Sequence, residues 1–212
     1  TDGTHYSAAI PTGTDAKSYT VYYKVVGDAN HTNTEAAQIS VTIAPKSIAG
    51  NVTITGTVEM DGTLTANYTN GATGETVRYQ WYRGENTIDG ATDETYKIVA
   101  ADMDQTIKVT VSGTGNYGGE QTSDPTTAVS KGTPTVNTWP TAGEITYGQS
   151  LRDSALTGGQ GSVAGTFSWT NGDTKPAVSD SNITQYSVTF TPSDEDSYNT
   201  VTGSITLTVN KA

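Results

Sequence analysis

Apolar and polar residues alternate over short stretches throughout the chain. In the clearest stretch, Thr76–Arg83, alternate positions hold Val77, Tyr79 and Trp81. Successive side chains of a β-strand point to opposite faces, so these three side chains are expected in a core and the residues between them outside it. The same alternation predicts further strands in this part of the chain, which together are Val52–Thr57, Thr63–Tyr68, Thr76–Arg83, Thr95–Val99, Thr106–Ser112 and Thr122–Val129.

Turn-forming residue pairs separate these stretches. Such pairs are the usual signal of tight connections between strands, because glycine and asparagine tolerate the backbone angles that a tight turn needs. No segment carries a sustained apolar period of 3.6 residues, so no helix is expected. The sequence therefore predicts an all-β fold. The pairs are Asp61-Gly62, Asn70-Gly71, Asp89-Gly90 and Gly118-Gly119.

One strand pattern occurs twice, at opposite ends of the chain. The stretch Ser18–Tyr23 returns in similar form as Gln185–Phe190. Each copy is followed by an alternating stretch, Ile39–Ile43 in the first case and Ile205–Val209 in the second, which we predict as its closing strand. A strand pattern repeated at domain-sized spacing is typical of a tandem array.

Two short segments containing proline mark the predicted seams of this array. They are Ala44–Ser47 and Ser130–Pro134. Proline ends a β-ladder because it has no N–H to donate, and seams this short leave little hinge freedom. We therefore predict three units: 1–46, 47–131 and 132–212.

The first unit is predicted to be incomplete. Thr1–Thr4 match Thr170–Asp173 of the last unit, so the first unit has no counterpart of 132–169. A half-sandwich exposes its inner face and leaves sheet edges open. We therefore expect 1–46 to be the C-terminal part of a sandwich domain. It should be stable only when it packs on the second unit, on another molecule or on a complementing fragment.

Composition narrows the classes of function. The formal net charge is −11 and the isoelectric point about 4.4, which argues against nucleic acid and anionic membrane surfaces as partners. Cysteine is absent, which excludes disulfides, thiol nucleophiles and cysteine-based metal sites. No apolar run approaches the roughly 20 residues that span a bilayer. An acidic, cysteine-free β-protein of this kind is expected to be exported from a bacterial cell.

The middle unit resembles the bacterial immunoglobulin-like tandem repeats of large Gram-positive cell-surface and secreted proteins. The resemblance rests on Tyr79–Arg83, Ile88–Thr92, Tyr96, Asp102 and Ile107–Val111. The first unit resembles the end of another such repeat through Thr1–Tyr6 and Tyr19–Val25. The last unit resembles a related module through Ile145–Leu151 and Tyr198–Asn199.

This resemblance implies tandem immunoglobulin-like β-sandwiches that lie outside the cell, at the cell wall or in secreted form. Such modules serve as stalks, spacers or adhesive domains. The matching positions are core and turn positions, so the resemblance assigns no functional residue. Asp102 is expected to order a turn through hydrogen bonds to the backbone.

The sequence assigns no catalytic, cofactor-binding or metal-ligating residue. The only histidines are His5, expected near a turn, and His31, which occupies the place of Tyr198 in the last unit. No Gly-x-Ser-x-Gly motif of the α/β-hydrolase type occurs. The acidic stretches Asp102–Asp104 and Asp194–Asp196 lack the spacing of a calcium loop and are interpreted as solvated loops. We therefore expect a protein that is not an enzyme and needs no cofactor.

The aromatic residues divide into core and surface candidates. Trp81 and Trp169 lie on the apolar phase of their strands and are assigned to cores. Trp139 precedes a proline outside any alternation and is the one tryptophan considered as exposed. Tyr22 and Tyr82 point away from their apolar neighbours, either as partner contacts or as cross-strand pairs that cover the sheet.

Three functions remain open at this point. The leading one is a non-catalytic spacer or stalk of a bacterial cell-surface protein, with neighbouring immunoglobulin-like repeats as its partners. The second is an adhesin module that binds a host glycan or matrix protein, which a cluster of exposed tyrosine and tryptophan would favour. The third is an accessory module of a secreted polysaccharide-degrading enzyme.

Overall fold

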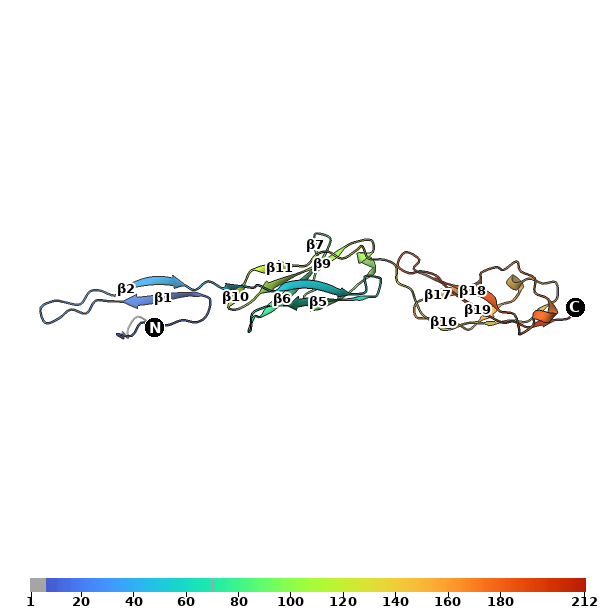
Figure 1. Cartoon of the computed structure of the whole chain (residues 1–212), viewed down its shortest axis with the longest axis horizontal. Coiled ribbons are helices and arrows are strands. Elements are labelled where there is room, and N and C mark those ends of the chain that lie inside the picture. Colours follow the sequence, from blue (N-terminus) through green and yellow to red (C-terminus); the bar gives the residue numbers. More distant parts are fainter. Residues whose placement is uncertain (1–6, 70) are drawn as a thin grey trace. The chain divides into compact units, whose positions relative to one another are not determined.

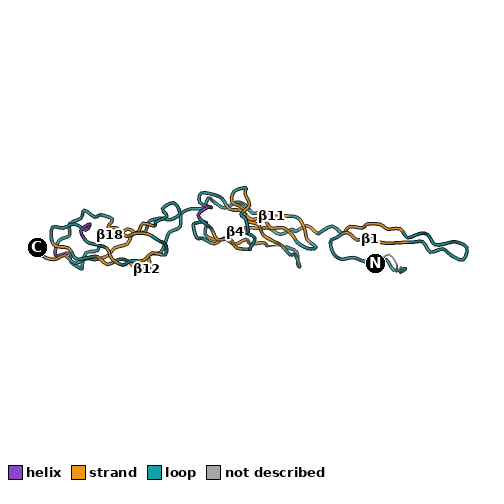
Figure 2. The backbone as a smooth tube through the Cα atoms, turned by 180° about the vertical axis from the view of Figure 1, so that it is seen from behind, coloured by secondary structure: helices purple, strands orange, loops and turns teal. Residues whose placement is uncertain are grey.

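The protein is built from short strands and the loops that join them. The computed structural model describes residues 7–69 and 71–212, and Figure 2 shows strands and loops making up nearly all of the chain. In these ranges the only helical segments are three single 3₁₀ turns: Ala100–Asp102, Leu151–Asp153 and Val178–Asp180. The predicted all-β fold is therefore confirmed, as expected for a chain rich in threonine, valine and tyrosine.

The chain divides into two compact units. The first runs as far as Thr55 and adds Thr65–Tyr96 and Ile107–Thr126. The second consists of Gly56–Leu64, Lys97–Thr106 and Thr127–Ala212. The second unit thus contains two short segments that the sequence assigned to the middle module, and the division into 1–46, 47–131 and 132–212 stays a prediction.

The first unit begins with a hairpin of β1 (Ser18–Tyr23) and β2 (Ala37–Thr42), which lie antiparallel (Figure 1). Paired residues share a face of the sheet. One face carries only apolar and aromatic side chains, and its members are Tyr19, Val21, Tyr23, Ala37, Ile39 and Val41. We call this set the hairpin face. Much of it is open to solvent, as expected for a half-sandwich: Tyr23 is 52%, Ile39 55% and Val41 46% exposed.

The rest of the first unit forms a sandwich of two β-sheets, apart from a few strand ends that belong to the second unit. A four-stranded sheet has the order β11-β9-β6-β7, and a three-stranded sheet has the order β4-β5-β8. Trp81 of β6 and Val109 and Val111 of β9 are fully buried, as predicted. The strands are β3 (Lys46–Ser47), β4 (Asn51–Gly56), β5 (Thr63–Thr69), β6 (Val77–Arg83), β7 (Asn86–Thr87), β8 (Thr95–Lys97), β9 (Ile107–Gly113), β10 (Tyr117–Gly118) and β11 (Glu120–Thr122).

One predicted strand of this sandwich is wrong in its bounds. The stretch Thr122–Val129 is not a continuous strand, because β11 ends at Thr122. Beyond that point the chain still follows β9: Ser123 donates to the Val109 carbonyl (2.9 Å) and Thr126 to that of Ile107 (2.9 Å). Pro125 lies between these two bonds and has no N–H, so the regular ladder cannot continue through it.

The second unit is made of small sheets. It contains two antiparallel strand pairs, β12-β16 and β13-β15, the parallel pair β14-β20, and the three-stranded sheet β17-β18-β19. Buried Ile145, Leu151, Leu207 and Val209 form one core cluster, against which Trp169 packs. The strands are β12 (Val136–Thr138), β13 (Thr141–Ala142), β14 (Ile145–Thr146), β15 (Leu156–Thr157), β16 (Gln160–Gly161), β17 (Gly165–Trp169), β18 (Tyr186–Pro192), β19 (Val201–Ile205) and β20 (Val209–Asn210).

The predicted closing strand Ile205–Val209 is also wrong. The strand that follows β18 is β19, which ends at Ile205, and the chain then leaves the sheet before the short strand β20. Leu207 and Val209 are nevertheless buried, because they belong to the core cluster around Ile145. The alternation of apolar residues here reports burial in that cluster and not a continuous strand.

Aspartates close the three 3₁₀ turns. The buried Asp102 accepts a hydrogen bond from the N–H of Val99 (2.8 Å), which confirms its predicted role in a turn. Asp153 and Asp180 do the same for the N–H groups of Ser150 (2.8 Å) and Ala177 (2.8 Å). Each carboxylate satisfies a backbone donor that the start of a helical turn leaves free.

Candidate functional site

A group of long-range polar contacts lies in the second unit, around the seam predicted at Ser130–Pro134. The Tyr198 hydroxyl donates a hydrogen bond to the Asp61 carboxylate, across 137 positions of sequence. The other carboxylate oxygen of Asp61 forms an ion pair with the Lys97 ammonium group at 2.9 Å. Asp61 has a positive φ of 65°, a conformation that suits the turn Asp61-Gly62 and places its side chain here.

Backbone bonds complete this arrangement. The N–H of Gly132 donates to the Ser197 carbonyl (3.0 Å), and the Gly132 carbonyl accepts from the N–H of Asn199 (2.9 Å). On the other side, the N–H of Met60 donates to the Ser130 carbonyl (2.9 Å). We call the group Met60, Asp61, Lys97, Gly132 and Tyr198 the seam clasp.

At Gly132 the backbone lies close to the backbone of Met60. Gly132 is buried, and a β-carbon there would lie 2.7 Å from the carbonyl oxygen of Met60. Carbon and oxygen atoms do not approach this closely without displacement of the backbone. Glycine is thus required here by space, since its lack of a side chain lets the two segments meet.

The hydrogen bond between Tyr198 and Asp61 shifts the pKa values of both side chains. It is the main cause that lowers the pKa of Asp61, with the Lys97 ammonium as the next contributor. The same bond is the main cause that raises the pKa of Tyr198 to about 12. The Asp61 side chain is 46% exposed, so solvent screens the pair and its net contribution to stability is small.

The seam clasp should therefore lose stability at high pH. The ordinary pKa of tyrosine is 10.0, and a raised folded-state pKa means that folding favours the protonated hydroxyl. This stabilisation is complete below pH ~10 and is lost as the pH rises through about 12. We expect Tyr198→Phe to lower the free energy of unfolding by ~0.5–1.5 kcal/mol at neutral pH.

The difference between wild type and Tyr198→Phe should shrink between pH ~10 and ~12. At the acid end, Asp61 has a lowered pKa, so its contribution is present above pH ~3.8 and is lost below it. Urea unfolding of both proteins across this pH range measures the difference between their free energies of unfolding. The contributions of the other tyrosines are the same in both proteins and cancel in this difference. A difference that does not change with pH would contradict the hydrogen bond.

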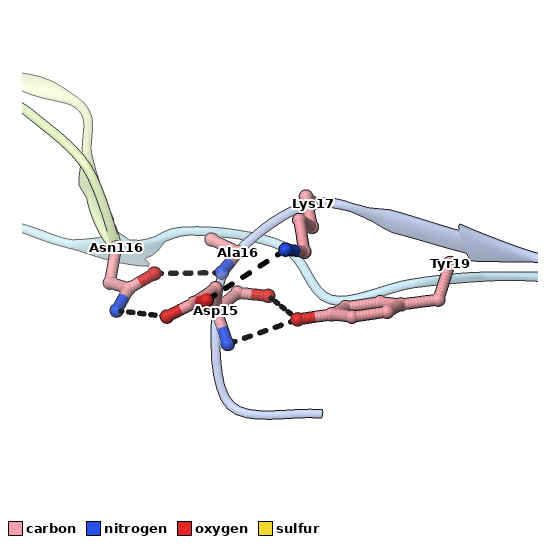
Figure 3. Close-up of polar contacts among 5 residues, drawn as sticks. All are labelled: Asp15, Ala16, Lys17, Tyr19 and Asn116. Carbon is pink, nitrogen blue, oxygen red and sulfur yellow. Dashed lines mark hydrogen bonds and ion pairs between the residues drawn. The ribbon is translucent and has the colours of Figure 1, made fainter. Parts of the chain in front are cut away.

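The base of the hairpin forms a second polar group, in the first unit. Figure 3 shows that Asn116 reaches the segment before β1, where its side-chain oxygen accepts from the N–H of Ala16 (2.8 Å). The Tyr19 hydroxyl donates to the Asp15 carbonyl (3.0 Å) on the same segment. The Lys17 ammonium lies 5.1 Å from the centre of the Tyr19 ring. These contacts hold the start of β1 in place.

The histidines and acidic stretches do not form a catalytic or metal centre in the described residues. His31 is exposed and its ring Nδ1 lies 2.6 Å from Asp28, while His5 lies outside the described residues, as does the predicted match at Thr1–Thr4. Asp102 is committed to its turn, and Asp194 accepts a hydrogen bond from the Ser197 N–H (3.1 Å). In residues 7–69 and 71–212 no three potential metal ligands gather.

The tryptophans pack inside the protein. Trp81 is fully buried, and the ring nitrogen of Trp169 donates to the Ser154 carbonyl (3.1 Å). Trp139, considered above as exposed, is half-buried instead. It meets Phe167 edge to face at 5.9 Å, and its ring fills the space that a β-carbon at Gly203 would take. Because Gly203 has no side chain, the Trp139 ring can pack directly on the backbone of β19 at this position.

The two tyrosine candidates differ. Tyr82 is half-buried, with the Lys108 ammonium 5.7 Å from its ring centre, so it behaves as the predicted cross-strand cover. Tyr22 is 37% exposed and lies opposite Gln38 on the polar face of the hairpin. Exposed apolar side chains gather instead on the hairpin face and at Val25 and Val26. No sequence pattern indicated the exposure of these two valines.

One hollow of the surface lies in the first unit. It has a volume of about 330 Å³ and lies between β4 and the chain after β11. Among the described residues that line it, Asp124 is the one ionisable residue, and the others are Asn51, Val52, Thr53, Ile54, Thr122, Pro125 and Thr126. No helix in the described ranges is long and apolar enough to cross a membrane.

Comparison with known proteins adds only a remote likeness. No family model matches the chain, and no curated protein does. Among solved structures, three immunoglobulin domains of titin in a mutated variant are 12% identical, with a TM-score of 0.30, over 92% of this chain and 74% of that one. Tandem immunoglobulin repeats of Dlar are 11% identical, with a TM-score of 0.22, over 78% of this chain and 97% of that one. The description of the fold therefore rests on the strand pairing itself.

Proposed function

We propose that this chain is a non-catalytic structural module, a spacer within the cell-surface stalk of a bacterial protein. The observation that carries the proposal is the seam clasp. A seam tied by backbone bonds at Gly132 and by the bond between Tyr198 and Asp61 has few free backbone angles. A spacer needs this property, because a flexible linker would lose the reach that the modules provide.

The packing of the tryptophans and the character of the sequence support the same function. Of the three tryptophans, which could stack on a sugar, Trp81 is fully buried, and Trp139 and Trp169 are half-buried against neighbouring residues. The resemblance of the sequence to bacterial immunoglobulin-like repeats supports an extracellular location and neighbouring repeats as partners. The net charge of −11 favours solubility and disfavours anionic surfaces.

Stretching single molecules from their two ends tests this proposal. A spacer should extend in discrete unfolding steps, because each packed β-unit unfolds cooperatively. It should also regain those steps after relaxation. Gradual extension without steps would contradict the proposal, because such a chain could not hold a distal domain at a fixed reach.

A binding test separates the spacer from the adhesin. The labelled chain is incubated with arrayed host glycans and matrix proteins, alongside the Tyr82→Ala variant. The spacer proposal expects no saturable signal from either protein. Saturable binding that Tyr82→Ala removes would overturn the proposal and make the β6 surface an adhesive site.

A further inference from the structure

The hairpin β1–β2 matches part of the sheet β17-β18-β19 pair for pair. In β18 the residues Tyr186, Val188 and Phe190 lie opposite residues of β19, in a continuous antiparallel register. In β1 the corresponding residues lie opposite β2 in the same register. The pairs are Tyr186↔Ile205, Val188↔Gly203 and Phe190↔Val201 in one sheet, and Tyr19↔Val41, Val21↔Ile39 and Tyr23↔Ala37 in the other.

The two sheets differ in a third strand. β17 pairs with the other edge of β18, where Phe167 lies opposite Phe190 with ring centres 5.0 Å apart. Figure 1 shows β2 alongside β1, and no strand of the described residues pairs with the other edge of β1. Within residues 7–69 and 71–212, the edge of β1 that corresponds to the β17 side of β18 is therefore open.

Hydrogen bonds show which backbone groups face this open edge. The Lys17 carbonyl accepts from the N–H of Ile43 (3.0 Å), and the Val25 carbonyl accepts from that of Thr34 (3.0 Å). Odd-numbered residues of β1 thus direct their backbone groups toward β2. Because the direction alternates along an antiparallel strand, Thr20 directs its N–H and C=O toward the open edge.

In β18, the residue that matches Thr20 makes a backbone hydrogen bond to the neighbouring strand. Ser187 corresponds to Thr20, and its carbonyl accepts from the N–H of Thr170, just beyond β17, at 3.0 Å. Side chains agree with the backbone: Val188 and Phe190 are buried, whereas Tyr23 at the position of Phe190 is 52% exposed. An open edge beside an apolar face is the usual template for strand addition.

We propose that the open edge of β1 binds an extended polypeptide strand that carries aromatic residues at alternate positions, in the pattern of Gly165–Trp169. The strand would run antiparallel to β1. Its first aromatic residue would lie opposite Tyr23 and its second opposite Val21, as Phe167 and Trp169 lie opposite Phe190 and Val188. The occupant is a polypeptide segment, and the inference does not depend on the spacer function.

The test uses the full chain and a labelled peptide with the sequence of residues 163–171. Fluorescence anisotropy is expected to show saturable binding. A control peptide with serine in place of both aromatic residues should bind about tenfold more weakly or not at all, since each lost apolar contact weakens binding. Hydrogen exchange should slow at the amide of Thr20 when the peptide is present.

Two proline variants locate the site. Thr20→Pro removes a donor at the open edge and keeps the bonds to β2, so it should weaken peptide binding at least about tenfold. Ser40 lies opposite Thr20 on β2, so its backbone faces away from β1, and Ser40→Pro should leave binding unchanged.

Three binding results would overturn the proposal. They are the absence of saturable binding, equal binding by the two proline variants, and equal binding of the control peptide. Sedimentation of the chain alone identifies a competing occupant. A concentration-dependent dimer that Thr20→Pro abolishes would show that the edge pairs with a second copy, and would also contradict the proposal.

Discussion

Replacing Trp81 with alanine is expected to lower the free energy of unfolding of the first compact unit by about 3–5 kcal/mol. Trp81 is fully buried between the sheets, and its ring stacks on Tyr96 with centres 5.7 Å apart. Its ring nitrogen also donates to the Asp93 carbonyl (2.9 Å). The substitution removes all of these contacts and leaves a cavity that a small sandwich cannot fill by collapse.

Urea unfolding followed by circular dichroism measures this loss. Arg78→Ala is the matched control, because Arg78 lies on the same strand with its side chain exposed. That variant should stay within about 0.5 kcal/mol of wild type. Equal losses in the two variants would show that Trp81 is not the centre of the core.

Replacing Gly132 with alanine is expected to open the seam clasp and to lower the free energy of unfolding of the second unit by about 1–3 kcal/mol. The added β-carbon would lie 2.7 Å from the Met60 carbonyl oxygen, so one of the two backbone segments must move. Movement would break the bonds of Gly132 to Ser197 and Asn199. Hydrogen exchange at the amides of Gly132 and Asn199 should therefore become faster.

Gly172→Ala provides the control for this substitution. A β-carbon at Gly172 would lie 3.5 Å from the nearest atom, in Arg152, which is an ordinary van der Waals contact. It should leave exchange at Asn199 as in wild type. If Gly132→Ala also left this exchange unchanged, the two segments would not meet at Gly132.

The core of the first unit could be predicted because its signal is local. Val109, Val111 and Trp81 recur at every second position of long strands, and this spacing alone places them on one face. The error at Thr122–Val129 has a local cause too, since Pro125 interrupts the ladder. Ile205–Val209 failed differently, because burial in a compact cluster can imitate the alternation of a strand.

The seam clasp could not be predicted, because its partners are distant in sequence. Nothing near Asp61 indicates a contact with Tyr198, which lies 137 positions away. The only local signals were the turn pair Asp61-Gly62 and a glycine within the predicted seam. Similarly, the repeated strand pattern predicted an exposed hairpin face. The direction of the Thr20 N–H and C=O could be assigned only from the hydrogen bonds of Lys17 and Val25 in the structure.

The central claim is that the seam at Gly132 is tied and not a free linker. The chain has no cysteine, so spin labels can be attached at two introduced cysteines without interference. Gln105 and Thr202 are exposed, and both belong to the second unit. Along the chain, Gln105 precedes the seam at Ser130–Pro134 and Thr202 follows it. Pulsed electron–electron double resonance measures the distance between the spin labels at these two sites. It should give one narrow distance distribution, which broadens in the Gly132→Ala variant. A broad distribution that is the same in both proteins would contradict the account.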